Sequence, residues 1–213
     1  MIKEKSKKRI LVIVTEGPTD EEFYKRVVEY TKQKNKCKKY NFDAIKYMCA
    51  GGIGNLHKKM LAKFKIEICK DDEFSNYEKI VCFCYDKDVF KKTNSNPPIN
   101  REKMKKDFFE AGASKIIEIV ADDMIEDFFL IDTAGIIKFL KLGKKYKIPQ
   151  KKSLDLLKQM YKDGNKIYSK GTKAEGLVDA LNMDLILSKI CCQLSSLCTE
   201  LGYCCNGTTC GSK

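Results

Sequence analysis

The sequence contains one histidine, His57, among 213 residues. Triad chemistry needs a histidine as the base that activates the nucleophile, and a histidine-rich metal centre needs several such side chains. This shortage therefore nearly excludes both classes of site.

The sequence also has no apolar run of the roughly 20 residues that a membrane-spanning helix requires. Its N-terminal segment, residues 1–9, is basic, and the apolar stretch that follows is too short for the core of a signal peptide. No small-residue cleavage pattern follows it. We therefore expect a cytoplasmic protein with no membrane partner.

Acidic residues are outnumbered, with 29 Asp and Glu against 41 Lys and Arg, which gives a net charge of +12. Such an excess attracts polyanions, although a lysine-rich surface can also serve only to keep a protein in solution. The apolar fraction of 43% is enough for a real core, and the length suits one domain with a small appendage.

Eleven cysteines are present, but disulfides are improbable in a cytosolic protein of this length. Cys82 and Cys84 lie within a strand pattern and are expected to be small buried side chains. Six others crowd the end of the chain without the paired C-x-x-C spacing of a zinc knuckle, so the pattern favours a reduced tail and leaves zinc open. These six are Cys191, Cys192, Cys198, Cys204, Cys205 and Cys210.

Strand patterns alternate with helix patterns along the first 130 residues, which predicts a parallel α/β sheet with right-handed crossovers. Apolar helical segments then continue to residue 197, with a break near Thr133 and Gly135. The predicted strands are 9–15, 41–49, 79–85 and 115–121. The predicted helices open at Pro18, after the glycine turn 51–54 and at Arg101, and then cover 124–142, a segment from Ser153, 173–181 and 184–194.

Carboxylates stand where two of these strands end. Glu16 follows the first strand, and Asp86 and Asp88 follow the third. Ligands of open parallel sheets bind just outside the carboxyl ends of the strands, and Mg²⁺ is a hard cation that one or two carboxylates hold. We therefore expect Glu16, Asp86 and Asp88 to meet around Mg²⁺ or Mn²⁺. Taken singly, each carboxylate is equally consistent with an ordinary turn.

Other charged side chains extend this expectation. Asp122, Asp123 and Glu126 follow the fourth strand and either lie near the metal or satisfy a helix N-terminus. Lysines near the same loops are candidates for holding a nucleic-acid backbone, whereas the glycine turn 51–54 lacks the Lys-Ser/Thr of a P-loop. The lysine candidates are Lys58, Lys59, Lys87, Lys91 and Lys92.

The segments VTEGPTDEEFY, with Glu16, and YDKDVF, with Asp86 and Asp88, resemble the two motifs of a Toprim domain. This family is shared by topoisomerases, bacterial primases, OLD-type nucleases and small RNase M5-like and RloB-like proteins. The resemblance implies a compact parallel sheet and Mg²⁺-dependent breaking or joining of phosphodiesters. It implies a metal-binding or acid/base role for Glu16 and metal-binding roles for the two aspartates. Residues 124–129 are similar to a glutamate-bearing helix of small Toprim proteins in defence systems, which implies a metal role for Glu126.

The chain departs from the larger Toprim proteins, because it shows no strand-passage domain, no primase zinc module and no ATPase motif. We therefore expect a stand-alone protein with a Toprim-like catalytic domain at 8–130, a helical extension at 131–197 and a flexible Cys/Gly-rich tail at 198–213. A separate ATPase or regulatory chain and a homo-oligomer remain open as partners.

The leading hypothesis is a Mg²⁺-dependent nuclease acting on RNA or DNA, in an antiviral defence or toxin-like system. A non-catalytic module of the same fold that binds nucleic acid or a partner is the alternative. A phosphotransfer receiver domain is disfavoured, because its acidic pair should follow the first strand, where Glu16 stands alone.

Overall fold

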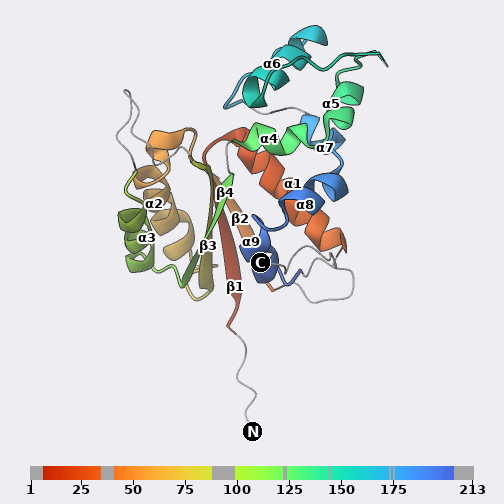
Figure 1. Cartoon of the computed structure of the whole chain (residues 1–213). Helices are drawn as coiled ribbons and strands as arrows, with labels where there is room; N and C mark the ends of the chain where they lie inside the picture. Colours follow the sequence, from red (N-terminus) through yellow and green to blue (C-terminus); the bar gives the residue numbers. More distant parts are fainter. Residues whose placement is uncertain are drawn as a thin grey trace.

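The computed structural model describes residues 7–34, 41–87, 99–121, 124–143, 145–172, 174 and 176–203. Its centre is a four-stranded, all-parallel sheet with the strand order β2-β1-β3-β4 (Figure 1). This confirms the predicted α/β class and the parallel four-stranded sheet flanked by helices. The strands are β1 (Arg9–Thr15), β2 (Ala44–Cys49), β3 (Glu78–Asp86) and β4 (Lys115–Ala121).

The two central strands are apolar throughout because helices cover both faces of the sheet. Residues 10–14 of β1 and 80–84 of β3 are fully buried. Strand β2 lies at an edge, where its residues are mostly half-buried and Lys46 is exposed. The long apolar runs in the sequence thus mark the middle of the sheet.

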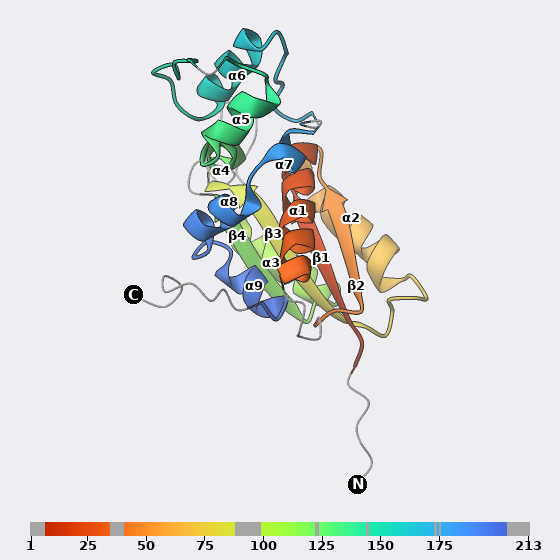
Figure 2. The ribbon, with the colours of Figure 1, turned by 90° about the vertical axis from the view of Figure 1, so that its right-hand side faces the viewer.

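Helix α1 (Pro18–Lys34) packs on one face of the sheet, whereas α2 (Lys58–Phe64), its π-helical continuation (Lys65–Cys69) and α3 (Arg101–Glu110) pack on the other (Figures 1 and 2). The crossover from β1 to β2 through α1 and the crossover from β3 to β4 through α3 lie on opposite faces, and the chain runs outward in opposite directions from β1 and β3. Their carboxyl ends therefore border the crevice in which ligands of open α/β sheets bind.

The C-terminal helices share one apolar core with α1 and its face of the sheet. The predicted extension therefore packs onto the sheet and does not form a core of its own. Among the described residues, no helix is long and apolar enough to cross a membrane. The helices are α4 (Ile125–Leu130), α5 (Thr133–Phe139), α6 (Ser153–Asp163), α7 (Leu177–Ala180), α8 (Met183–Ile190) and α9 (Ser195–Glu200).

Several predicted boundaries differ from the structure. Strand β2 begins at Ala44 instead of residue 41, since the Asp43 carboxylate accepts the backbone N–H of Arg9 at 2.8 Å and ends the pairing there. The helix expected over 173–181 shrinks to α7, because Gly171 and Gly176 have φ values of +85° and +72°, which no α-helix contains. Helix α8 ends at Ile190, four residues before the predicted end.

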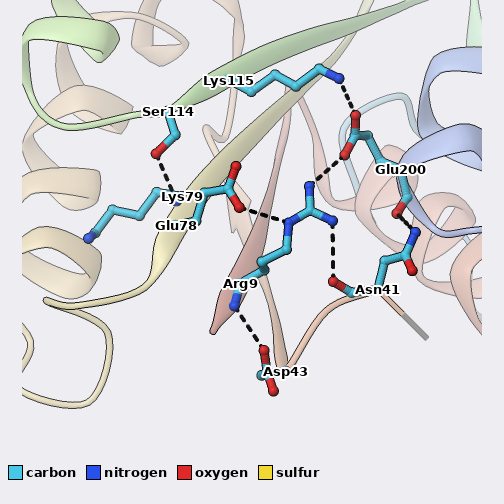
Figure 3. A network of polar contacts seen from close by, with 8 residues as sticks. All are labelled: Arg9, Asn41, Asp43, Glu78, Lys79, Ser114, Lys115 and Glu200. Carbon is cyan, nitrogen blue, oxygen red and sulfur yellow. Dashed lines mark hydrogen bonds and ion pairs between the residues drawn. The ribbon is translucent and has the colours of Figure 1, made fainter. Parts of the chain in front are cut away.

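Glu200 fastens the last helix to the start of the sheet (Figure 3). Its carboxylate accepts a bond from Arg9 Nη2 at 2.9 Å and pairs with Lys115 Nζ, while Asn41 Nδ2 donates to its backbone oxygen at 3.1 Å. Leu201 beyond it is fully buried. The tail predicted to be flexible from residue 198 is therefore folded as far as residue 203, and residues 204–213 lie outside the described part of the chain.

We expect Glu200→Gln to lower the free energy of unfolding at neutral pH by about 1 kcal/mol, because the charge-assisted bonds to Arg9 and Lys115 weaken. Burial raises the pKa of Glu200, but the bonds from Lys115 and Arg9 outweigh burial and leave it below its ordinary value. The stabilisation is therefore complete above the ordinary pKa of 4.5 and is lost as the pH falls through the lower folded value. Urea denaturation between about pH 7 and pH 3 should show a smaller acid loss in the variant than in the wild type.

Candidate active site at the carboxyl end of the sheet

A cavity of about 390 Å³ opens at the carboxyl ends of β1 and β3. Its wall carries four carboxylates and one ammonium group, from Glu16, Asp20, Asp86, Glu126 and Lys170. Glu16 and Glu126, which are 110 positions apart in the sequence, thus line the same pocket. The structure brings together three residues expected at the site, Glu16, Asp86 and Glu126, and adds Asp20 and Lys170.

Asp86 is the last residue of β3 and is 3% exposed. Its Oδ1 accepts the backbone N–H of Ile125 at 3.1 Å, and its Oδ2 accepts a charged hydrogen bond from Lys170 Nζ at 3.1 Å. The strand-end carboxylate is therefore tied both to the start of α4 and to the loop that carries Lys170.

Glu16 leaves β1 beside the turn that follows β2. The backbone N–H of Gly52 donates to the Glu16 carbonyl at 2.9 Å, which holds this turn against the end of β1. Gly51 and Gly52 have φ values of +68° and +124°, a conformation that L-residues with a side chain rarely adopt. The glycine turn singled out in the sequence thus forms the rim of the pocket.

Asp20 lies in the first turn of α1, where its Oδ2 accepts the backbone N–H of Gly17 at 3.0 Å. Burial, together with the charges of Asp86 and Glu16, raises the pKa of Asp20 to about 7. In the sequence, Asp20 is simply an acidic residue at the start of a predicted helix. Its position beside the other carboxylates of the pocket depends on the packing of α1 next to the end of β3, which the sequence does not show.

Glu126 on α4 is 1% exposed. Tyr168 donates its hydroxyl to Glu126 Oε1 at 3.0 Å, whereas Oε2 is buried with no hydrogen-bond partner among the described residues. A buried carboxylate oxygen without a donor carries a desolvation penalty that a cation or a proton would relieve. Glu126 thus brings to the wall of the pocket a carboxylate oxygen that a cation or a proton could satisfy.

Lys170 belongs to the segment that follows α6, which we call the strap (residues 165–172). Thr19 of α1 donates to the backbone oxygen of Thr172, and the Ala174 N–H donates to Glu22 Oε2 at 3.0 Å. Burial lowers the pKa of Lys170, but the charges of Asp86, Glu126 and Glu16 more than offset burial, so the pKa is raised and the ammonium stays charged.

The lysines proposed to bind nucleic acid lie elsewhere. Lys58, Lys59 and Lys87 are exposed, and none of these three lines the cavity. Lys59 Nζ approaches the Ala50 carbonyl at 3.4 Å, close to the glycine rim. Five further candidates fall outside the described residues: Asp88, Lys91, Lys92, Asp122 and Asp123.

The donor set of the pocket is of the kind that suits Mg²⁺ or Mn²⁺, because four carboxylates line it and one of their oxygens is buried without a hydrogen-bond partner among the described residues. Within the described part of the chain, no three Asp, Glu, His or Cys side chains stand close enough together to hold a metal ion. The cation next to Asp86 in this arrangement is instead the ammonium of Lys170.

Comparison with protein-family models, curated proteins and solved structures found no match to this chain. The fold and the pocket therefore define a class in chemical terms: an α/β protein with a parallel sheet and an acidic pocket at the crevice between β1 and β3.

Proposed function

We propose that this protein is a metal-dependent nuclease that hydrolyses phosphodiester bonds in RNA or DNA. The proposal depends chiefly on one observation, the four carboxylates that line a single pocket at the carboxyl ends of β1 and β3. Four acids in one small space repel one another unless cations or protons intervene. The net charge of +12 on the whole chain adds a preference for a polyanionic substrate.

The carboxylates of Glu16, Asp86 and Glu126 would close around Mg²⁺, since without it no three acids of the described residues stand within metal-binding reach of one another. The Toprim resemblance adds Asp88 to this set. When bound, the metal would polarise the scissile phosphate and stabilise the charge that develops on it. Asp20, with a pKa of about 7, can take up or release a proton near neutral pH. Glu16 is a second candidate for this proton transfer, in keeping with the Toprim resemblance.

The exposed lysines would position the substrate by its backbone. Lys58 and Lys59 begin α2, directly after the glycine rim of the pocket, and Lys87 follows Asp86 in the chain. Contacts of lysine with phosphate carry no sequence information, so they suit either RNA or DNA.

We expect the purified protein to degrade total cellular RNA or plasmid DNA when Mg²⁺ or Mn²⁺ is present, and to leave both intact in EDTA, because the reaction needs the divalent cation. Gel electrophoresis after a time course measures the cleavage. Intact substrates with every metal, at protein concentrations that bind the nucleic acid, would contradict the proposal.

One observation favours the non-catalytic alternative. The ion pair between Lys170 and Asp86 already neutralises the carboxylate at the end of β3 without any metal. A module of this kind would retain nucleic acid on a filter and cleave none of it, with or without divalent cations. The same assay therefore separates the two functions.

A further inference from the structure

The strap brings a positive charge into a pocket whose other charged groups are all negative. Lys170 Nζ lies 3.1 Å from Asp86 Oδ2, and the Asp86 side chain is 4% exposed. The Lys170 side chain is 38% exposed, so its ammonium reaches the carboxylate from the solvent side. An ammonium in this place competes directly with a divalent cation for the same oxygen.

The Lys170 side chain can leave this position without movement of the strap. The strap itself is held on both sides of Lys170: Thr172 is bonded to α1, and the buried Tyr168 is bonded to Glu126 and packs edge-on against Tyr161. Ser169 and Lys170 themselves are exposed, and Gly171, next in the chain, has a φ value of +85°. Rotation within the long, partly exposed lysine side chain is enough to turn its ammonium from a carboxylate toward a new anion in the open pocket.

We propose that Lys170 is an internal counter-cation that keeps affinity for divalent metal low in the free protein and makes metal binding depend on a phosphate-bearing polyanion. This inference rests on the proposed function, and it adds a regulation of the same site. A phosphodiester entering the cavity offers the Lys170 ammonium another anionic partner. Asp86 is then released for the metal, and the two ligands bind with positive coupling.

The balance of charge supports this order of events. With Lys170 paired to Asp86, three other carboxylates line the same cavity, and Lys170 is the one cationic side chain among its described lining residues. The free protein thus offsets part of the negative charge of this cavity with an ammonium and without a metal.

The test measures metal affinity and not cleavage. Mn²⁺ is titrated into the protein and followed by electron paramagnetic resonance, with and without a single-stranded oligonucleotide whose phosphorothioate linkages resist cleavage. The variants are Lys170→Met and, as a control with the same charge change in the same strap, Lys166→Met. Lys166 lies over the ring of Phe139 at 4.2 Å and does not line the acidic pocket.

We expect Lys170→Met to bind Mn²⁺ at least about tenfold more tightly than the wild type without oligonucleotide, and Lys166→Met to match the wild type. The oligonucleotide should tighten Mn²⁺ binding to the wild type by roughly 5- to 150-fold, the usual range of such coupling, and have much less effect on Lys170→Met.

Equal Mn²⁺ affinity of Lys170→Met and the wild type, or equal coupling in both, would overturn the counter-cation role while leaving the proposed nuclease in place. Absence of any saturable Mn²⁺ binding in all three proteins would overturn both. Circular dichroism of each variant establishes that the fold is kept, so that a loss of binding is not mistaken for unfolding.

Discussion

Asp86→Asn should reduce metal-dependent cleavage about a thousandfold, which corresponds to roughly 4 kcal/mol of lost transition-state stabilisation. The amide keeps the shape of the side chain and can still accept the backbone N–H of Ile125, now bonded to Asp86 at 3.1 Å. It loses the negative charge that a divalent cation needs. The start of α4 therefore stays in place while the metal site is lost.

Initial cleavage rates of the Asp86→Asn variant, measured with saturating Mg²⁺, give the size of this effect. Asp163→Asn is the matched control, because Asp163 is an exposed carboxylate on α6 that pairs with Tyr146 and Gln159 and lies outside the pocket. Unchanged cleavage by Asp86→Asn would show that the activity belongs to a contaminant or to another part of the surface.

Phe129→Ala should lower the free energy of unfolding by about 3–5 kcal/mol, the usual cost of removing a fully buried aromatic ring. Phe129 is 0% exposed, and its ring centre lies 5.6 Å from that of Phe23 on α1. Helices α1 and α4 carry Asp20 and Glu126, so this pair of rings fixes the distance between two carboxylates of the site.

Phe109→Ala provides the control for the Phe129 experiment. Phe109 is 48% exposed on α3, and its removal should change the free energy of unfolding by no more than about 0.5 kcal/mol. Urea denaturation followed by circular dichroism measures both variants. A Phe129→Ala variant as stable as Phe109→Ala would contradict the packing of α4 on α1 through this ring.

Local patterns were enough to predict much of the fold. The bounds that the sequence indicates are correct for strands β1 and β4 and for helix α3. These elements depend on neighbouring residues: each strand is a mainly apolar segment of seven residues, and the helix ends just before Gly112. β3 is one residue longer at each end, so that Asp86 lies within the strand and pairs with Ala121.

The less accurate predictions depend on contacts between distant residues. The folding of α9 follows from the pairing of Glu200 with Arg9, 191 positions earlier, and the sequence near residue 200 gives no sign of this partner. The cysteines and glycines around it are typical of a tail. A local pattern therefore could not show that this helix packs against the sheet, on the same face as α1.

The candidate site likewise contains some residues that the local sequence could predict and others that depend on contacts between distant segments. Glu16 and Asp86 could be expected from strand ends alone, since parallel strands end at one edge. Asp20 has an ordinary role in capping α1, which conceals its place among the carboxylates. Lys170 is one lysine in a lysine-rich chain, and only the return of the strap over α1 brings it to Asp86.

The central claim is that the carboxylates at the ends of β1 and β3 gather around a divalent cation. Anomalous diffraction from crystals grown with Mn²⁺ and an uncleavable oligonucleotide tests it most directly. The account predicts a Mn²⁺ peak bounded by Asp86 and Glu16, with the Lys170 ammonium turned away from Asp86. A Mn²⁺-free pocket in which Lys170 stays on Asp86 while nucleic acid is bound would contradict it.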